Sequence, residues 1–296
     1  MRTTWWDLLA ADGPIVADGG MGTMLFSMGL ARGESPEMWN DERQDDVRSI
    51  HRAYIQAGAQ IVLTNSFGGN RYRLGMHDLA ERAAELNTAA ARLARAEADA
   101  AERAVVVGGS MGPTGQMLAP MGTLPFDDAV AAFEEQARAL AAGGVDVLWI
   151  ETMSDLEEVR AAVEGCRRAA PDVPVVTTMT FDTRGRTMMG VKPEQALEAL
   201  QAFGVVALGA NCGNGPDELE TAVGKMHDAG SPVPLVAKAN AGLPHMEGDV
   251  AVYDASPDVM AEYAVRVRDQ GARIIGACCG STPDHIRAIT QALSGE

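Results

Sequence analysis

The strongest constraint on the fold of this chain is a regular alternation of short apolar runs and longer helical patterns, which can be counted eight times in 296 residues. Most of the apolar runs are nearly continuous hydrophobics, which is typical of strands that are buried on both faces of a parallel sheet. Each run ends in a turn that is rich in Gly, Asn, Ser or Cys. The predicted strands span residues 15–18, 61–65, 105–110, 145–151, 173–180, 205–212, 235–240 and 273–279.

The helical patterns between these strands carry start and stop signals. Ser256 and Thr282 each place a capping hydroxyl before a proline, which is favoured at the first helical position. Ser154 and Glu157 have the spacing of a capping box, so we expect Ser154 to cap the helix after the fourth strand. Glycines that can adopt the left-handed conformation close several helical patterns, namely Gly58, Gly143, Gly144, Gly230 and Gly271.

Eight β-then-α units predict an α/β fold, a closed (β/α)8 TIM barrel, in which residues 1–296 form a single domain. An open doubly wound sheet is the alternative, and it usually carries a G-x-G-x-x-G fingerprint after its first strand. The first turn here, at residues 18–23, has the sequence Asp-Gly-Gly-Met-Gly-Thr and does not fit that fingerprint. No linker-like or low-complexity stretch interrupts the pattern, so one barrel is the simpler interpretation.

The composition excludes several classes of partner. The chain has 24 Lys and Arg against 41 Asp and Glu, and its net charge of −17 argues against binding to nucleic acid or to an anionic membrane. The N-terminal segment lacks the apolar run of a signal peptide, and no stretch approaches the length of a membrane span. Four cysteines are too few for a disulfide framework in a chain of this length. We therefore expect a cytoplasmic protein whose cysteines are free thiols or metal ligands.

Three of the four cysteines lie where a barrel places its active site, at the C-terminal ends of strands. Cys212 ends the sixth predicted strand, whereas Cys278 and Cys279 end the eighth and are followed by the flexible Gly280. Alternate strands contribute to the same layer of a barrel, so these side chains can converge above its rim. Three thiolates suit Zn²⁺ and leave its fourth position open, as in catalytic zinc sites. The pattern thus predicts a zinc site at Cys212, Cys278 and Cys279.

Two other interpretations of these cysteines remain open. A buried cysteine can simply be a small hydrophobic residue, which is how we interpret Cys166 on its helix. A vicinal disulfide between Cys278 and Cys279 is the second alternative. A zinc ion held by three thiolates is a modest Lewis acid, but it can bind a further thiol and lower the pKa of that thiol. This chemistry indicates alkyl transfer to a substrate thiol.

These motifs resemble the zinc-dependent homocysteine S-methyltransferase family, which includes betaine–homocysteine methyltransferase and the homocysteine-binding module of cobalamin-dependent methionine synthase. The resemblance extends over essentially the whole chain, from residues 18–23 to residues 276–283, and includes Thr-Asn-Ser-Phe at 64–67 and Glu-Thr-Met-Ser-Asp at 151–155. It implies methylation of homocysteine to methionine, with zinc bound by the three cysteines at the strand ends.

The resemblance also implies which residues hold homocysteine. Glu151 would take the ammonium group of the substrate, and Asp18 would be the second carboxylate of the catalytic site. Asn240 matches a family position that approaches zinc when homocysteine is absent. The full set of expected substrate-binding residues is Asp18, Gly19, Gly20, Met21, Phe67, Ser110, Glu151 and Asn240.

Two departures from the family pattern concern the methyl donor. Family members that use betaine hold its quaternary ammonium in an aromatic cage. This chain has Gly68 and Thr152 where cage tyrosines are expected, although Trp39, Phe67 and Tyr72 could rebuild a cage. We therefore expect a methylcorrinoid partner or a sulfonium compound as donor, with betaine as the alternative. No D-x-H-x-x-G cobalamin motif occurs, so a corrinoid would have to arrive on a separate protein.

Other classes of function stay open. One is a zinc-thiolate protein that binds thiols without turnover. Another is a metal-independent barrel with Lys192 or Lys238 as a Schiff-base lysine, of which only Lys238 lies near a strand end. The G-x-S-x-G pattern at residues 108–112 suggests a hydrolase nucleophile, but Pro113 prevents the helix that this motif requires. The oligomeric state does not follow from the sequence.

Overall fold

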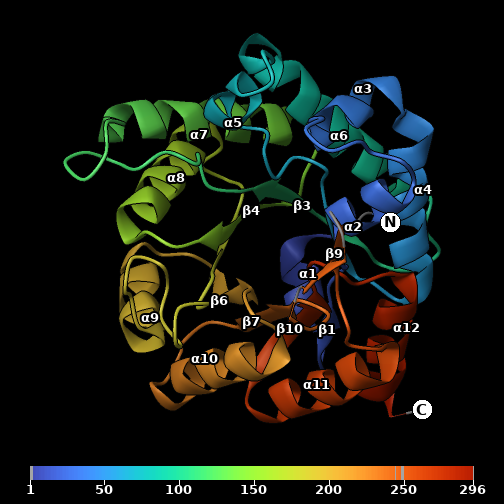
Figure 1. Ribbon diagram of the computed structural model, residues 1–296. Coiled ribbons are helices and arrows are strands. Elements are labelled where there is room, and N and C mark those ends of the chain that lie inside the picture. The colour runs from blue at the N-terminus through green and yellow to red at the C-terminus, as the bar shows by residue number, and fades with distance from the viewer. Residues whose placement is uncertain (1–2, 244, 248–249, 296) are drawn as a thin grey trace.

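The computed structural model describes residues 3–243, 245–247 and 250–295. Its centre is an eight-stranded parallel sheet with the order β1-β10-β7-β6-β5-β4-β3-β2 (Figure 1). The first and last strands of this order also meet, because Ala17 bridges to Ile61 and the N–H of Asp18 donates to the carbonyl of Ile61 at 3.0 Å. The predicted (β/α)8 barrel is therefore confirmed. Its strands are β1 (Ile15–Val16), β2 (Ile61–Leu63), β3 (Val106–Met111), β4 (Val147–Met153), β5 (Val175–Met179), β6 (Ala207–Cys212), β7 (Leu235–Ala239) and β10 (Ala272–Ala277).

Helices alternate with the strands and form the outer ring of the barrel (Figure 1). The longer helices are α4 (Gln44–Ala57), α6 (Ala83–Asp99), α7 (Phe126–Gly143), α8 (Leu156–Ala169), α9 (Pro193–Ala202), α10 (Pro216–Asp228), α11 (Pro257–Asp269) and α12 (Pro283–Ser294). Shorter helical segments are α1 (Trp5–Ala10), α2 (Met21–Ser27), η1 (Pro36–Met38), α3 (Trp39–Glu42), α5 (Arg71–Gly75) and η2 (Ala80–Arg82). In the described part of the chain, no helix is both long enough and apolar enough to cross a membrane.

Most of the predicted helix signals are confirmed. Ser256 and Thr282 are the N-caps of α11 and α12, and left-handed glycines end α4 and α7. The predicted cap of α8 is wrong by one residue, since the side chain of Asp155, rather than that of Ser154, accepts the N–H of Glu157 at 2.9 Å. An ionised carboxylate interacts more favourably than a hydroxyl with the positive end of the helix dipole, which explains the shift.

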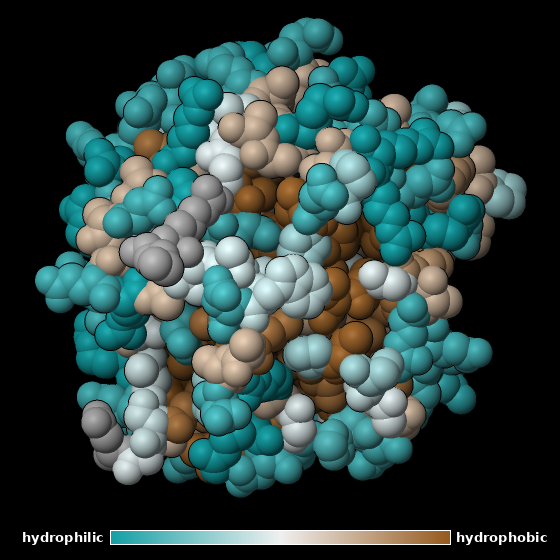
Figure 2. All heavy atoms as spheres, turned by 180° about the vertical axis from the view of Figure 1, so that it is seen from behind, coloured by the Kyte–Doolittle hydropathy of each residue, from teal (hydrophilic) through white to brown (hydrophobic). Residues whose placement is uncertain are grey.

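Apolar side chains fill the barrel, and α1 closes one of its ends. Trp5 and Leu8 of α1 are buried in this interior, and the ring of Trp5 meets that of Trp149 edge-on with centroids 6.4 Å apart. A larger apolar layer lies between the strands and the helices. Seen from behind, the molecule has apolar atoms gathered towards its centre and hydrophilic residues around its edge (Figure 2). The interior is thus a packed core that leaves the opposite end of the barrel for a site.

The sequence pattern does not predict one element, a hairpin that follows β7. Its strands β8 (His245–Glu247) and β9 (Val250–Val252) pair antiparallel. Strands of three residues are too short to show a hydrophobic period, so the pattern cannot distinguish them from a loop. The hairpin continues the chain from the C-terminal end of a barrel strand, which is the end where barrels carry their active sites.

Candidate metal and substrate site

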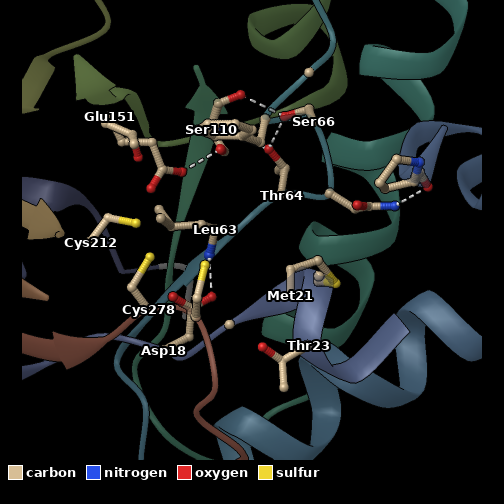
Figure 3. Close-up of a pocket in the computed structure, with 18 of the residues that line it drawn as sticks. Asp18, Met21, Thr23, Leu63, Thr64, Ser66, Ser110, Glu151, Cys212 and Cys278 are labelled. Atoms are coloured by element: carbon tan, nitrogen blue, oxygen red, sulfur yellow. Dashed lines mark hydrogen bonds between the residues drawn. The ribbon is translucent and has the colours of Figure 1, made fainter. Parts of the chain in front are cut away.

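Three cysteine side chains meet at the C-terminal ends of two strands. Cys212 is the last residue of β6, and Cys278 and Cys279 follow directly after β10. Their sulfur atoms lie within 4.8 Å of one another and form the one such cluster of potential metal ligands found among the described residues. Figure 3 shows the thiols of Cys212 and Cys278 directed towards each other at the edge of a cavity. The expected convergence is observed, whereas Cys166 is buried in α8.

The backbone beside the cysteines adopts conformations that bring the thiols together. Cys212 has φ +63°, in the left-handed region that residues other than glycine rarely occupy. Gly280 has φ +82°, and a Cβ atom at this position would lie 2.2 Å from Cγ of Tyr253. Only glycine fits there, so the chain can turn sharply after Cys279 and both adjacent thiols can face Cys212.

Asn240 connects the two loops that carry the cysteines. Its side-chain N–H donates to the carbonyl of Gly213 at 2.6 Å, and its side-chain oxygen accepts the N–H of Cys279 at 3.1 Å. We expected Asn240 to bind substrate, but it is not among the described residues that line the cavity. Because both ends of its amide hold backbone groups, Asn240 supports the cysteine loops in this structure.

The three thiols influence one another strongly. Hydrogen bonds among the thiols act on these pKa values in both directions, and together with burial and like-charge repulsion the net effect raises the pKa of Cys212 and of Cys279 to about 12. The same causes raise the pKa of Cys278 well above its ordinary value. Three thiolates at this spacing therefore need a cation beside them, and a soft divalent metal would supply that charge.

The cysteines line one side of a cavity of about 380 Å³ (Figure 3). Residues near the C-terminal ends of β1, β2, β3, β4, β6, β7 and β10 contribute to its wall. Sites predicted at separate strand ends are thus neighbours in space. The expected substrate-binding residues that line the cavity are Asp18, Gly19, Gly20, Met21, Phe67, Ser110 and Glu151.

Glu151 lies in β4, at a register shift in the pairing with β5, and is directed into the cavity (Figure 3). The hydroxyl of Ser110 donates to Oε1 of Glu151 at 2.5 Å, and the side-chain amide of Asn211 lies 3.5 Å from Oε2. Burial raises the pKa of Glu151, while the charge of Lys238 and the Ser110 hydrogen bond oppose the shift. Ser110 is inside β3 rather than on a strand-to-helix elbow, so its hydroxyl serves Glu151 and not a hydrolase reaction.

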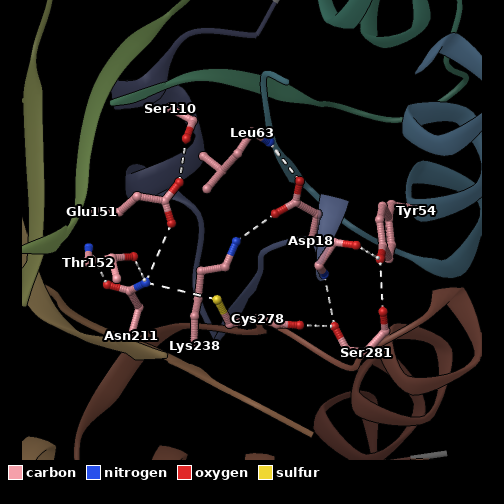
Figure 4. A network of polar contacts seen from close by, with 11 residues as sticks. Asp18, Tyr54, Leu63, Ser110, Glu151, Thr152, Asn211, Lys238, Cys278 and Ser281 are labelled. Atoms are coloured by element: carbon pink, nitrogen blue, oxygen red, sulfur yellow. Dashed lines mark hydrogen bonds and ion pairs between the residues drawn. The ribbon is translucent and has the colours of Figure 1, made fainter. Parts of the chain in front are cut away.

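Asp18 and Lys238 form an ion pair beside Glu151 (Figure 4). Nζ of Lys238 donates to Oδ1 of Asp18 at 2.6 Å, and the N–H of Leu63 donates to Oδ2 at 2.7 Å. Each charged side chain is only 2% exposed. Burial disfavours the charged form of Lys238, but the carboxylates of Asp18 and Glu151 outweigh it and raise the pKa of Lys238. Lys238 therefore remains a cation in the pair.

Lys238 lines the cavity, but the sequence suggests for it only the role of a Schiff-base lysine and not that of an ion-pair partner. A lysine inside the apolar run of β7 is the available signal, since a buried charge must find a partner. The pattern does not say which partner, because Asp18 is 220 residues away in the chain. A protonated, paired lysine is not nucleophilic, which argues against a Schiff base at Lys238, and Lys192 lies at the start of α9, outside the cavity.

The side of the cavity near Gly68 offers little room for an aromatic cage. The N–H of Gly68 donates to Oε1 of Glu37 at 2.7 Å, and a Cβ atom at position 68 would lie 2.9 Å from that oxygen. Trp39 is buried, and neither it nor Tyr72 lines the cavity. Phe67 is the single Phe, Tyr or Trp among the described lining residues. Of the three side chains that could rebuild an aromatic cage, Phe67 therefore lines the cavity, whereas Trp39 and Tyr72 do not.

Comparison with known families places this site in context. The family model for homocysteine S-methyltransferase matches residues 15–293. The chain belongs to the homocysteine S-methyltransferase family. Its three clustered cysteines and its buried glutamate thus lie at the strand ends of a homocysteine S-methyltransferase barrel.

Relatives with known names are methionine synthases and a homocysteine methyltransferase. The methionine synthases of Mycobacterium leprae and Mycobacterium tuberculosis are 35% identical over 294 residues, a match that covers 95% of this chain and 24% of each relative. The chain therefore spans about a quarter of their length. Among solved structures, the metallated form of the homocysteine methyltransferase MmuM from Escherichia coli has a TM-score of 0.81 and 25% identity, and the match covers 96% of this chain and 97% of that one. A methyltransferase from Methanosarcina mazei, with 12% identity and a TM-score of 0.64, shares the fold.

Proposed function

We propose that this protein is a zinc-dependent S-methyltransferase that transfers a methyl group to the thiolate of homocysteine and so forms methionine. The observation that carries this proposal is that three cysteine sulfurs within 4.8 Å of one another face the same cavity as the buried carboxylate of Glu151. A soft-metal site and an anionic group for an ammonium ion then lie within one small cavity. Membership of the homocysteine S-methyltransferase family supports the same activity.

The residues present fit Zn²⁺. Cys212, Cys278 and Cys279 would supply three sulfur ligands, and all three residues line the cavity that would admit a fourth ligand. When bound, zinc would supply the charge that keeps a coordinated thiol in its thiolate form at neutral pH. The similar E. coli enzyme is described in a metallated form, which supports a metal here without naming it.

The residues of the chain would hold the amino-acid end of homocysteine. Glu151 offers a carboxylate oxygen to the ammonium group, and Ser110 fixes the orientation of that carboxylate. Gly19, Gly20 and Met21 form the adjoining wall, where a Cβ atom at Gly20 would lie 2.7 Å from the carbonyl of Cys278. With the ammonium held at Glu151 and the sulfur near the cysteines, the sulfur forms its new bond to the methyl carbon as the bond between that carbon and the donor breaks.

For the methyl donor we propose a methylcorrinoid carried by a separate protein, or a sulfonium compound, in preference to betaine. Glu37 occupies the space that an aromatic side chain at position 68 would need, and Trp39 and Tyr72 do not line the cavity. A quaternary ammonium ion would thus lose cation–π contacts worth about 0.5–2 kcal/mol each. The similarity to proteins named methionine synthase supports a corrinoid partner. Betaine remains the alternative donor.

The proposal includes a cytoplasmic location, because free thiols at a metal site are maintained in a reducing compartment. It includes no nucleic-acid or membrane partner, in agreement with the net charge of −17. Homocysteine and the donor are the partners it requires.

A panel of donors tests this function. Zinc-loaded protein is mixed with homocysteine and with betaine, S-methylmethionine, a dimethylsulfonio compound or a methylated corrinoid protein, and methionine is measured. We expect methionine from the corrinoid protein or from a sulfonium compound. Turnover with betaine alone would reverse the donor assignment. Binding of homocysteine without methionine from any donor would instead favour a thiol-binding protein that has no catalytic activity.

A further inference from the structure

The cysteine cluster raises a question of selectivity between sulfurs. Once a substrate thiol joins Cys212, Cys278 and Cys279, four sulfurs lie close together, and every thiolate among them is a nucleophile towards a methyl group. Methylation of the substrate gives product, whereas methylation of a cysteine turns that side chain into an uncharged thioether and removes an anionic metal ligand. Productive turnover therefore requires the cysteine sulfurs to react more slowly than the sulfur of homocysteine.

Tyr253 packs against the loop that carries Cys279. It follows β9 directly, and its ring lies so close to Gly280 that a Cβ atom there would be 2.2 Å from Cγ of the tyrosine. Two backbone hydrogen bonds of 2.9 Å fix the same segment, from the N–H of Ala255 to the carbonyl of Ala241 and from the N–H of Ala241 to the carbonyl of Cys279. The chain thus leaves the hairpin beside a cysteine of the cluster.

The hydroxyl of Tyr253 donates a hydrogen bond to the sulfur of Cys279. Burial, the nearby thiolate charge and this hydrogen bond raise the pKa of Tyr253, so its hydroxyl keeps the proton and remains a donor. An O–H donor stabilises a thiolate and takes up part of the electron density of its lone pair. A thiolate stabilised in this way is a weaker nucleophile.

The other two sulfurs also have donors from the chain. The side-chain amide of Asn211 is directed at Cys278, with 4.0 Å between Nδ2 and Sγ (Figure 4), and the N–H of Gly213 donates to the sulfur of Cys212. The described residues that line the cavity do not include any of the three donors, Asn211, Gly213 and Tyr253. These donors therefore reach the sulfurs from the protein side, and a thiol that enters through the cavity would not share them.

We propose that Tyr253 protects Cys279 from methylation, through a hydrogen bond that makes this sulfur a weaker nucleophile than the sulfur of homocysteine. Asn211 and Gly213 act in the same way on the other two cysteines. This inference rests on the proposed function and deepens it. Tyr253 is a positioning residue, because it acts through Cys279 and does not line the cavity.

The suppressed reaction is a simple displacement. The sulfur of Cys279 would give an electron pair to the methyl carbon, and the bond between that carbon and the donor would break, with its electrons leaving on the donor. The hydrogen bond from Tyr253 holds part of that electron pair, so this displacement is slowed at Cys279 and not at the substrate sulfur.

Site-resolved methylation tests this role. Zinc-loaded wild-type protein and Tyr253→Phe, which keeps the ring on Gly280 and removes only the hydroxyl, are treated with methyl iodide in the absence of homocysteine. Initial rates of S-methylation are measured at each cysteine by peptide mass spectrometry. We expect Cys279 to react about 3- to 10-fold faster in Tyr253→Phe, because one charged hydrogen bond is lost and thiolate nucleophilicity follows basicity with a slope of about 0.4–0.5. The rate at Cys212 should not change, since its donor is a backbone N–H.

Tyr72→Phe is the matched control. Tyr72 is also partly buried against the core, and it lies in α5, away from the cysteine loop. Its substitution should leave all three rates unchanged. Zinc is measured in every sample, because a variant that merely loosens the site would lose zinc and react faster at all three cysteines. Either that result in Tyr253→Phe, or a rate at Cys279 equal to that of wild type, would overturn the proposal.

This test and the donor panel can fail separately. Methyl iodide replaces the natural donor, so selective methylation of Cys279 in Tyr253→Phe does not depend on which donor the enzyme uses. If wild-type protein forms methionine and Tyr253→Phe shows no selective methylation, only the inference fails. If wild-type protein does not retain zinc, the proposed function fails and the inference falls with it.

Discussion

At the scale of single residues, Glu151 combines deep burial with a carboxylate oxygen, Oε2, whose one hydrogen bond among the described residues is a long contact of 3.5 Å from Asn211. It is 7% exposed, and its strong hydrogen bond from Ser110 orients the carboxylate without neutralising it. We predict that Glu151→Gln weakens homocysteine binding by about 10- to 150-fold, because the amide carries no charge to pair with the ammonium group. Zinc content, measured by metal analysis of the same sample, should stay full.

Glu158 offers a matched control for that substitution. It is also a buried carboxylate, which accepts the N–H and the hydroxyl of Thr114, but it does not line the cavity. Glu158→Gln should therefore leave the dissociation constant of homocysteine unchanged. Equal effects of the two substitutions would mean that Glu151 contributes only through folding.

The sequence predicts which functional side chains lie at the ends of strands. It does not predict which of these side chains are hydrogen-bond or ion-pair partners across the barrel. Cys212, Cys278 and Cys279 could be proposed as one cluster because each ends a predicted strand. The role of Asn240 could not, because its partners lie on two other loops. The role of Lys238 could not be predicted either, since its contact with Asp18 depends on which strands close the barrel.

At the scale of elements, the loop after β10 depends on a glycine for two separate reasons. Gly280 has φ +82° and a Cβ atom there would overlap the ring of Tyr253. We predict that Gly280→Ala loosens the cysteine loop, so that zinc is lost at a lower concentration of a competing chelator. The urea midpoint should fall as well, because about 1–2 kcal/mol of left-handed strain adds to the overlap.

Substitution of Gly230 separates the left-handed backbone strain from the steric overlap. Its φ is +81°, but a Cβ atom at this position would meet nothing within 4 Å. Gly230→Ala should thus show the strain alone, with full retention of zinc in the chelator competition. The same loss of zinc in both variants would contradict the role of Tyr253 packing at the cysteine loop.

The elements themselves were largely predictable. The eight predicted apolar runs correspond to the eight barrel strands, since strands buried on both faces are apolar along most of their length. The hairpin of β8 and β9 was not predictable, because strands of three residues carry no period. The cap of α8 was predicted one residue too early, because Ser154 and Asp155 are both favoured N-cap residues and the sequence pattern alone does not show that the carboxylate of Asp155 caps the helix.

At the scale of the whole molecule, the barrel makes distant parts of the chain neighbours. β1 pairs with β10 and bridges to β2, so the two ends of the chain are tied into one sheet. For this reason we propose that residues 1–296 form one domain. The alternation along the sequence predicts the barrel, but it does not predict that α1 fills one end with Trp5.

The stability of the whole molecule should depend on pH through His51 of α4. Its ring is fully buried, neither nitrogen has a hydrogen-bond partner among the described residues, and burial lowers its pKa from 6.5 to about 4. Below pH 6.5 the unfolded chain takes up a proton that the native state refuses. The free energy of unfolding should therefore fall by about 2 kcal/mol between pH 7 and pH 5 from this group alone.

Urea unfolding at pH 7 and at pH 5 measures this effect. The substitution His51→Leu removes the titrating group and keeps an apolar side chain in the core, so the variant should lose less stability than wild type between the two pH values. An equal loss in both proteins would show that His51 does not titrate between the native and unfolded states.

X-ray absorption at the zinc edge tests most directly whether Cys212, Cys278 and Cys279 hold a metal that receives the substrate thiol. We predict three sulfur ligands and one light-atom ligand without substrate, and four sulfur ligands after homocysteine is added. Cys212→Ala should lose zinc, whereas Cys166→Ala should keep it. A zinc ion with two or fewer protein sulfurs, or one whose sulfur count does not rise with homocysteine, would contradict the proposed site.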